Sequence, residues 1–356
     1  MFVMRNLSRR RALTCMLSMA AVASVLFALG SGAQAQAQER KNPLTPVKSW
    51  GYQLRNLGPA QQAKIAASPY DLVIIDDLIG ADDEGSGGKR RHLTREEVER
   101  MKKKPDGSRR LVINYFSIGE TENYRDYWRP EWNRIRPSWM SKENKEWKGN
   151  YLVQYWNPTW QQIIFGSPEA YADQVLAEGF DGFYFDRVDA YYYFGDNKQA
   201  RDRMVDFVTK LSAYLRKKKP DVAIIVQNAE ELLDNPAYVD AVDGIAKESP
   251  IYGIKGADVL NPRDDISHTS NLLQTFQKKG KKVFVVEYLR KPDTIADAVK
   301  RTKDLGWVLY MGPRGLAQLS GATPEGYSPE QVKATESWSG APVAAAVKPT
   351  AKGKTK

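Results

Sequence analysis

Residues 178–190 read Glu178-Gly-Phe-Asp-Gly-Phe-Tyr-Phe-Asp-Arg-Val-Asp-Ala190. The aromatic run 183–185 predicts a short buried strand, and acidic residues follow it at Asp186 and Asp189. A strand holds its last residue rigidly while the loop after it is free to vary, so Asp186 is a candidate catalytic residue. The alternative is that Asp186 only caps the next helix or pairs with Arg187.

The same alternation of strand and helix patterns runs from about residue 46 to residue 325. The predicted strands are residues 50–54, 71–77, 111–120, 183–185, 223–228, 244–249, 283–288 and 307–311. Helical patterns follow most of them, among them 59–67, 161–177 and 198–216, and a capping box at Thr94–Glu97 opens another helix that runs to Lys104. Eight such units predict an α/β fold, a single-domain (β/α)₈ TIM barrel.

Two features of this pattern admit another interpretation. The run 151–156 is a ninth strand candidate, and we interpret it as decoration of the third loop because eight strands suffice without it. A doubly wound open sheet is the alternative fold, but no Gly-x-Gly-x-x-Gly follows the first strand to support nucleotide binding.

The two ends of the chain differ in composition from the middle. Residues 1–37 have a basic start, an apolar run and the small-residue pattern Ala33-Gln-Ala35, which predicts a secretory signal peptide cleaved after Ala35 or Ala37. An uncleaved membrane anchor is the alternative, and the arginine pair hints at twin-arginine export to the periplasm or medium. The predicted domains are therefore a leader (1–37), the barrel (38–325) and a disordered Ala/Pro/Lys-rich tail (326–356).

Charge and cysteine content exclude several classes of function. Of the net charge of +10, the leader and residues 341–356 carry four positive charges each, which leaves about +2 for the rest. A nearly neutral body argues against a nucleic-acid partner. The one cysteine, Cys15, lies in the predicted leader, so the mature protein would have no disulfide, thiolate nucleophile or cysteine metal site.

The carboxyl ends of the strands in a barrel meet on one face, and here they carry polar side chains. These are Tyr52, Gln53, Asp76, Asp77, Ser117, Glu120, Asp186, Asp189, Asn228, Glu230, Glu248, Glu287 and Tyr288. Aromatic residues accompany them: Tyr115, Tyr155, Trp156, Tyr191, Tyr192, Tyr193 and Tyr252. Carboxylates at six strand ends exceed what helix capping explains. The aromatic rings suit stacking against sugars, although ordinary packing is the alternative for any one of them.

An acid-rich, aromatic-rich face suits glycoside hydrolysis. One carboxylic acid protonates the leaving oxygen, and a second carboxylate acts as nucleophile or as base toward water, without a cofactor or a metal. His92 and His268 are predicted to be solvated, so a histidine zinc site is poorly supported. No Gly-x-Ser-x-Gly elbow is present, while a carboxylate Mg²⁺ or Ca²⁺ site around Asp76, Asp77 and Asp186 stays open.

Several motifs together carry a resemblance to a known family. They are Ser117-Ile-Gly-Glu120, Tyr124-Arg125, Tyr127-Trp128, Tyr155-Trp-Asn-Pro158, Gly179-Phe-Asp-Gly-Phe-Tyr-Phe-Asp-Arg-Val-Asp189 and Lys247-Glu-Ser249. Over about residues 46–315 the chain resembles glycoside hydrolase family 114, the endo-α-1,4-polygalactosaminidase group of (β/α)₈ barrels. The family usually has Asp where Asn157 stands here.

The resemblance implies an exported glycosidase that cuts a galactosamine-containing polysaccharide at internal linkages. It implies Asp186 as nucleophile or electrostatic stabiliser and Glu248 as general acid/base, and the reverse assignment stays open. The expected substrate-binding residues are Tyr52, Asp77, Tyr115, Glu120, Tyr155, Trp156, Asp189, Asn228, Glu230, Tyr252 and Glu287. A non-catalytic polysaccharide-binding barrel, or a metal-dependent phosphodiesterase or deacetylase, are the alternatives. No cofactor, nucleic acid or membrane span of the mature chain is expected, and the oligomeric state is left open.

Overall fold

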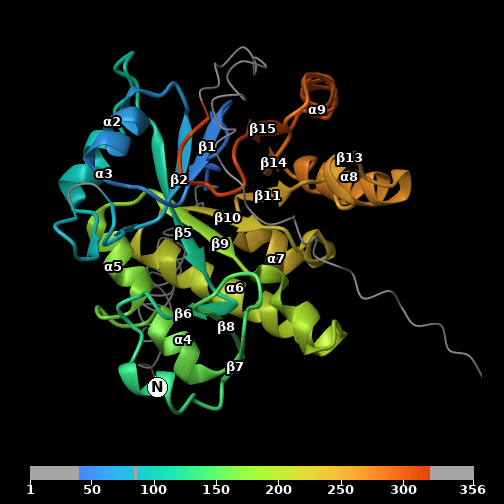
Figure 1. Ribbon diagram of the computed structural model, residues 1–356. Coiled ribbons are helices and arrows are strands. Elements are labelled where there is room, and N and C mark those ends of the chain that lie inside the picture. Colours follow the sequence, from blue (N-terminus) through green and yellow to red (C-terminus); the bar gives the residue numbers. More distant parts are fainter. Residues whose placement is uncertain (1–39, 84–85, 321–356) are drawn as a thin grey trace, which may run out of the picture. The chain divides into compact units, whose positions relative to one another are not determined.

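A computed structural model of the chain describes residues 40–83 and 86–320, and the unit described below begins at Asn42. Its centre is a sheet of eight parallel strands (Figure 1). In order around the sheet these are β1 (Trp50–Gln53), β2 (Leu72–Ile75), β5 (Leu111–Ser117), β9 (Gly182–Asp186), β10 (Ala223–Gln227), β11 (Gly244–Glu248), β14 (Lys282–Glu287) and β15 (Val308–Met311). All eight predicted strands are confirmed, and the fold is a (β/α)₈ barrel.

The first and last strands nearly close the barrel. Strands β1 and β15 are joined by side chains: Trp50 Nε1 donates to the carbonyl of Val308 at 2.9 Å, and the Tyr310 hydroxyl donates to the carbonyl of Tyr52 at 3.2 Å. The doubly wound open sheet is therefore wrong for this chain.

The helices are arranged around the strands (Figure 1). They are α2 (Pro59–Ala67), α3 (Arg95–Met101), α4 (Pro158–Ile164), α5 (Tyr171–Glu178), α6 (Lys198–Lys218), α7 (Pro236–Ala241), α8 (Arg263–Gln277) and α9 (Pro292–Asp304). The predicted capping box is confirmed, with Thr94 Oγ1 accepting from the Glu97 amide at 3.2 Å. The predicted helix 161–177 is wrong as one element: α4 and α5 are separated where Gly166 has φ +115° and Pro168 follows.

Extra elements follow the carboxyl ends of three barrel strands. After β5, the strands β6 (Glu120–Glu122), β8 (Asn150–Val153) and β7 (Met140–Glu143) form a three-stranded antiparallel sheet. The run 151–156 thus lies outside the barrel sheet, as predicted. The unpredicted hairpins β3 (Leu78–Ile79)/β4 (Arg91–His92) and β12 (Tyr252–Gly253)/β13 (Gly256–Leu260) follow β2 and β11. Among the described residues there are also three 3₁₀ helices: η1 (Pro130–Asn133), η2 (Val188–Phe194) and η3 (Glu230–Asp234).

Two glycines determine the conformation of the connection between α5 and β9. Gly179 caps α5 with φ +96°, a left-handed conformation that glycine adopts without a steric penalty. At Gly182 a Cβ atom would lie 2.1 Å from the carbonyl oxygen of Ala223 on β10, so only glycine allows the two strands to pair here. These glycines set the register that carries Asp186 to the end of β9.

The inside of the barrel is filled largely by aromatic rings. The Trp50 ring lies 6.0 Å from that of Tyr52, 5.4 Å from Phe284 and 5.6 Å from Tyr310, and the Tyr52 ring lies 5.3 Å from that of Tyr184. Residues two apart on a strand share a face, so Tyr184 lies directly below Asp186. The aromatic layer therefore forms the floor of the carboxyl-end face.

One buried arginine joins two helices to the sheet. Arg110, fully buried just before β5, donates to the carbonyls of Tyr70 at 2.8 Å and Met101 at 2.9 Å, and also to those of Ile65 and Ser68. These carbonyls lie at or just beyond the carboxyl ends of α2 and α3, where helices leave acceptors unsatisfied. The cation thus satisfies the ends of both helices.

The predicted leader 1–37, with Cys15, and the predicted tail 326–356 lie outside the described residues. In the described part, every helix is too short or too polar to cross a membrane.

Candidate active site

Asp186 ends β9 on the carboxyl-end face of the barrel. Its Oδ2 accepts a hydrogen bond from the Tyr115 hydroxyl of the adjacent strand β5, and its Oδ1 accepts from the Arg187 amide at 2.7 Å. The second bond is possible because Arg187 has φ +60°, which turns the chain sharply after the strand. The pKa of Asp186 is raised to about 7, chiefly by burial and also by nearby Asp189 and Glu248, which together outweigh the lowering effects of Arg187 and Tyr115.

Glu248 ends β11 and is held from both neighbouring strands. Its Oε1 accepts from the hydroxyl of Tyr288, which follows β14, and its Oε2 accepts from Asn228 Nδ2 at 3.4 Å. The Glu248 amide in turn donates to Asn228 Oδ1 at 3.1 Å, so Asn228, which follows β10, binds both ends of the residue. The side chain is thus fixed in direction as well as position.

The two carboxylates share one electrostatic environment above the aromatic floor. Burial raises the pKa values of Tyr52 and Tyr184 well above the usual range, and the charges of Asp186 and Glu248 raise both further. The charge of Glu248 also raises the pKa of Asp186. A pair of carboxylates on one face, each bound by a tyrosine hydroxyl, can supply an acid and a nucleophile or base to a glycosidic bond.

Three other predicted acids on this face are paired with half-buried cations. Arg187 lies 3.1 Å from Glu120 and 3.8 Å from Asp189, and Lys247 Nζ lies 3.0 Å from Glu230. These carboxylates therefore hold their cations in place rather than presenting open negative charge. The sequence offers Arg187 only as a partner for Asp186, whereas its ion pairs are with Glu120 and Asp189. Lys247 is not singled out from the sequence, although it lies beside Glu248 in a quoted motif.

A second buried network surrounds Arg125. Its guanidinium contacts Asp76 at 2.6 Å, Asp77 at 2.8 Å and Glu122 at 2.7 Å, and the Tyr171 hydroxyl donates to Asp77 at 2.6 Å. Asp77 is fully buried, so its predicted contact with substrate is wrong. The Mg²⁺ or Ca²⁺ site that the sequence left open at Asp76, Asp77 and Asp186 is not favoured, because Arg125 pairs with the first two carboxylates and the Tyr115 hydroxyl bonds to the third.

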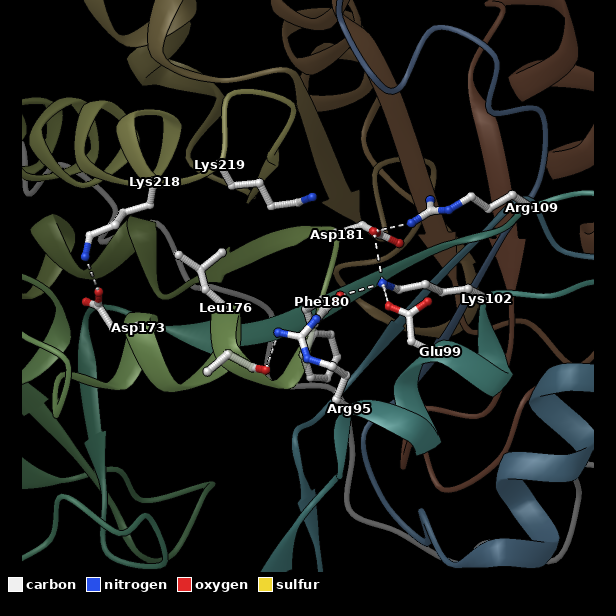
Figure 2. A pocket seen from close by; sticks show the side chains of 12 residues that line it. Arg95, Glu99, Lys102, Arg109, Asp173, Leu176, Phe180, Asp181, Lys218 and Lys219 are labelled. Atoms are coloured by element: carbon white, nitrogen blue, oxygen red, sulfur yellow. Dashed lines mark hydrogen bonds and ion pairs between the residues drawn. The ribbon is translucent and has the colours of Figure 1, made fainter.

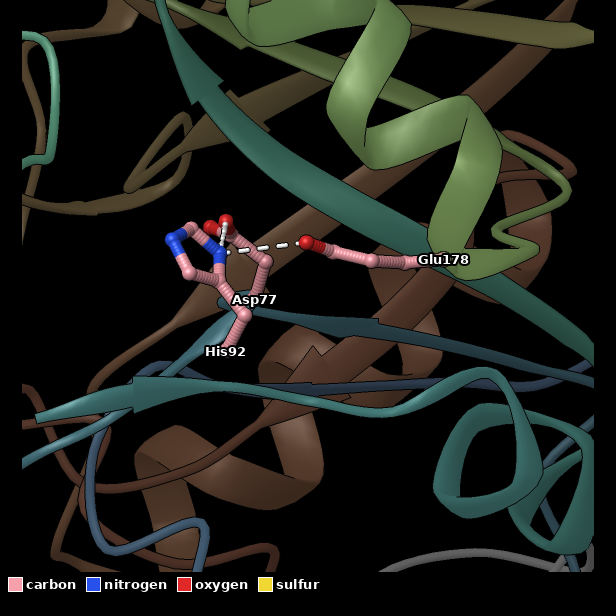
Figure 3. Close-up of side chains that lie close together, drawn as sticks. All are labelled: Asp77, His92 and Glu178. Atoms are coloured by element: carbon pink, nitrogen blue, oxygen red, sulfur yellow. Dashed lines mark hydrogen bonds and ion pairs between the residues drawn. The ribbon is translucent and has the colours of Figure 1, made fainter.

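His92 lies inside this network rather than in solvent. Its Nδ1 is 2.8 Å from Asp77 Oδ2 and 3.1 Å from Glu178 Oε1 (Figure 3). Its Nε2 is 2.8 Å from Asp126 Oδ2. Hydrogen bonds to Asp77 and Glu178 raise the pKa of His92 to about 11. The prediction of a solvated His92 is therefore wrong, whereas His268 is exposed as predicted.

Four other predicted substrate-binding residues contact helices or loops of the protein itself. Tyr155 is fully buried and donates to the carbonyl of Ala200 in α6 at 2.7 Å, and Arg203 of α6 covers the Trp156 ring at 4.5 Å. Tyr252 donates to Asp297 of α9 at 2.6 Å. Each aromatic residue thus packs against a helix. The predicted contact of buried Tyr155 and Tyr252 with substrate is wrong, whereas that of half-buried Trp156 stays a prediction.

Glu287, the last residue of β14, is the fourth of these residues. It is fully buried and accepts from the amides of Ile251 at 2.9 Å and Tyr252 at 3.4 Å. Burial raises its pKa to about 8. Glu287 therefore shapes the loop after β11, and its predicted contact with a sugar is wrong.

Two exposed aromatic rings flank the carboxyl-end face. Tyr193 of η2 is 63% exposed and has the Arg187 guanidinium 5.3 Å from its ring centre. Trp147, between β7 and β8, is 44% exposed and has Arg55, which follows β1, at 5.8 Å. Both rings offer a face to solvent beside residues that border the carboxylates.

A pocket of about 550 Å³ lies at the opposite end of the strands (Figure 2). It is lined by the ends of α5 and α6, by α3 and by the residues that lead into β5 and β9, among them Arg109 and Asp181. Its charged groups pair with one another: Asp181 lies 2.6 Å from Arg109 and 3.3 Å from Lys102, and Lys218 lies 3.2 Å from Asp173. Charge pairing at the amino-terminal end of a barrel serves stability.

Comparisons with known proteins agree with this geometry. The model of glycoside-hydrolase family GH114 matches residues 33–323. An uncharacterized protein of Deinococcus radiodurans is 34% identical over 284 residues, covering 79% of this chain and 85% of that protein. An uncharacterized protein of Methanocaldococcus jannaschii is 35% identical over 278 residues, covering 74% of each.

Two solved structures share the fold. The glycoside hydrolase domain of PelA from Pseudomonas aeruginosa superposes with a TM-score of 0.56 at 17% identity, covering 76% of this chain and 96% of that one. Aspergillus fumigatus Ega3, solved in complex with galactosamine, gives a TM-score of 0.52 at 17% identity, covering 81% and 99%. At this identity the likeness establishes the barrel fold.

Proposed function

Because the chain belongs to glycoside-hydrolase family GH114, we propose that this glycosidase cuts a galactosamine-containing polysaccharide at internal linkages. Asp186 and Glu248 are its two catalytic carboxylates in this proposal. The observation that carries the proposal is the placement of these two residues at the ends of β9 and β11 on one face of the barrel. Each carboxylate also accepts a hydrogen bond from a tyrosine hydroxyl. The substrate class is supported by the galactosamine complex of Ega3.

In the proposed reaction Asp186 acts as an anion and Glu248 as the proton donor and acceptor. Asp186 receives N–H or O–H donors at both oxygens, an arrangement that favours its ionised form. It then stabilises or attacks the anomeric carbon while Glu248 protonates the leaving oxygen. The Tyr52 and Tyr184 rings beneath them exclude water from the buried side of the pair.

The pH dependence tests this assignment of roles. Burial raises the pKa of Asp186 to about 7, so kcat/KM is expected to fall about tenfold per pH unit below that value. Tyr115→Phe removes a donor that lowers this pKa. A hydrogen bond to a charged group is worth about 1.5 kcal/mol, so the acidic limb should move up by about one pH unit.

The variant profile separates titration from damage to the site. Tyr115→Phe should lose about five- to tenfold in kcat/KM near pH 7 and approach wild type near pH 9. Tyr288→Phe, which removes the hydroxyl bound to Glu248 instead, should leave the acidic limb where it is. Because substrate amines titrate equally in all three proteins, only the difference between profiles is used. An acidic limb that moves in Tyr288→Phe and stays in place in Tyr115→Phe would reverse the roles of the two carboxylates.

The substrate is tested by reducing-end release and product size. Purified protein is incubated with partially deacetylated galactosamine polymer, with the fully N-acetylated polymer, and with partially deacetylated glucosamine polymer as the C4-epimeric control. We expect polymer size to fall before monomers accumulate, on galactosamine polymer only and with or without chelator at 25 °C. Binding without release would favour the non-catalytic polysaccharide-binding barrel, and loss of release on chelation would favour the metal-dependent hydrolase.

The exposed rings Tyr193 and Trp147 are expected to bind sugar faces on either side of the cut. Tyr193→Ala and Trp147→Ala should each raise KM about fivefold, corresponding to about 1 kcal/mol of lost stacking, with kcat little changed. Ile135→Ala is the control, because Ile135 is 66% exposed, lies in the same insertion after β5 as Trp147 and has no ring. Equal KM values for all three variants and wild type would remove the stacking role.

We further propose that the protein is exported, with residues 1–37 as its signal peptide. Amino-terminal sequencing of the protein recovered outside the cytoplasm should begin at residue 36 or 38. Recovery of the intact chain in the membrane fraction would instead support an uncleaved anchor.

A further inference from the structure

A cluster of three metal-type ligands lies apart from the catalytic pair. Asp77 follows β2, His92 ends β4 and Glu178 ends α5, and one ligand atom from each lies within 4.8 Å of the other two (Figure 3). The proposed mechanism uses none of the three. The elements that supply them are separate in sequence, so the cluster ties two of the chain's early units to the helix before β9.

The three ligand atoms face one another and little else. Asp77 Oδ1 accepts hydrogen bonds from Arg125 and from the Tyr171 hydroxyl. The other oxygen, Oδ2, lies against His92 Nδ1. Glu178 Oε1 lies 3.1 Å from the same nitrogen, and Glu178 Oε2 is buried with no hydrogen-bond partner in the described part of the chain. An orphaned carboxylate oxygen beside three facing ligands is an unusual feature of a protein interior.

The distances between these atoms fit a small divalent ion after a slight expansion. Zinc binds nitrogen and oxygen ligands at about 2.0–2.2 Å, which places tetrahedral ligands about 3.3–3.6 Å apart. The observed separations from His92 Nδ1 are 2.8 Å and 3.1 Å. An increase of about 0.2–0.8 Å in these separations thus converts the hydrogen-bonded cluster into a coordination sphere, with Glu178 Oε2 or water available as the fourth ligand.

The surroundings of the cluster also suit a metal. His92 Nε2 lies 2.8 Å from Asp126 Oδ2, and metal-binding histidines commonly donate their second ring N–H to a carboxylate in this way. The buried carboxylates of Asp76, Asp77, Glu122 and Glu178 outnumber the two cations Arg125 and His92. A divalent ion in place of the Nδ1 proton adds one positive charge where negative charge is in excess.

We propose that Asp77 Oδ2, His92 Nδ1 and Glu178 Oε1 form a structural binding site for a zinc-class divalent cation. An imidazole ligand favours zinc over magnesium and calcium, which prefer all-oxygen sites. The bound ion ties the carboxyl end of β2 and the β3/β4 hairpin to α5. Its role is in stability, because the acid/base pair is made of other residues.

The test is metal content and thermal stability of the untagged full chain. After exposure to zinc and exhaustive dialysis, wild type should retain about one zinc per chain. Added zinc should raise the Tm of chelator-treated protein by about 5 °C, as expected for a ligand well above its Kd, and magnesium should not. Cobalt substitution should give the visible absorption bands of a four-coordinate site, a readout that needs no variant.

Matched variants locate the ion. Glu178→Gln and His92→Gln should each abolish zinc retention and the rise in Tm on adding zinc. Asp126→Asn should weaken zinc binding about 10- to 100-fold. The control His268→Gln, which removes the exposed histidine, should behave as wild type. Glu178 lies at the end of α5, so its variant remains informative if His92→Gln fails to fold. Zinc below about 0.1 per chain in wild type, or retention of it by Glu178→Gln, would overturn the proposal.

The proposed zinc site and the proposed glycosidase activity can be refuted independently of each other. Chelator-treated protein should still release reducing ends at 25 °C, well below its Tm, while its Tm is lowered. A protein that binds zinc but hydrolyses nothing would leave the metal site standing and refute the proposed function.

Discussion

Asp186→Asn and Glu248→Gln are each expected to lower kcat for polymer cleavage by about 10³-fold or more, the scale of losing a positioned acid/base or nucleophilic group. Both substitutions keep the size of the side chain and replace one oxygen by an amide. The asparagine would no longer offer a negative charge to the anomeric carbon, and the glutamine would have no proton to give. Single-turnover and steady-state release of reducing ends from the galactosamine polymer measure the loss.

The double variant sharpens this test. Groups that act in one reaction are not additive, so Asp186→Asn with Glu248→Gln should be little slower than the slower single variant. Asp206→Asn, at an exposed carboxylate on α6, is the control for expression and handling and should match wild type. Loss of less than tenfold in either single variant, with unchanged polymer binding, would assign the chemistry to another residue.

Arg125→Met is expected to lower the free energy of unfolding by about 3–5 kcal/mol, the cost of leaving buried charges without their partner. Arg125 is almost fully buried and contacts Asp76, Asp77 and Glu122. Methionine fills part of the volume but leaves three carboxylates facing one another. Urea denaturation in the presence of chelator, with the slope m checked for a two-state transition, gives the value.

A surface pair provides the contrast for this prediction. Lys300→Met removes one partner of the exposed i,i+4 pair Lys300–Asp304, which should change stability by less than about 1 kcal/mol. If Arg125→Met does not fold, Arg125→Lys keeps the charge and should lose a smaller amount. Equal stabilities of Arg125→Met and Lys300→Met would mean that the carboxylates around Arg125 are neutral in the folded protein.

The barrel was predictable because its strands are buried on both faces. Runs such as Leu72–Ile75 and Ala223–Gln227 are buried throughout and lead into polar residues, so both their number and their ends are visible in the sequence. The same ends located Asp186 and Glu248, with Tyr115 and Asn228 beside them. The break between α4 and α5 was missed because its apolar spacing continues across Gly166 and Pro168.

The charge partners in the site were not predictable from these patterns. A strand end gives the position of an acid along the barrel axis but not which cation will reach it. Arg125 lies 49 residues from Asp76 in the sequence and His92 lies 15 from Asp77, and both are brought in by insertions after strands. The sequence pattern also does not indicate the direction of a side chain in a loop. For this reason the prediction puts Tyr155 and Tyr252 at the sugar site, although their hydroxyls bond to α6 and α9.

Arg110, which precedes β5, determines which parts of the protein should unfold locally together. Arg110 donates hydrogen bonds to backbone carbonyls at the carboxyl ends of both α2 and α3. If the last turn of one helix unwinds, the guanidinium becomes exposed to solvent, and its hydrogen bonds to the other helix are weakened as well. The amides of both helices should therefore exchange with deuterium at a common rate, together with β5, as one cooperative unit. The hairpin β12/β13, which no buried arginine joins to a helix end in the described part of the chain, should exchange earlier.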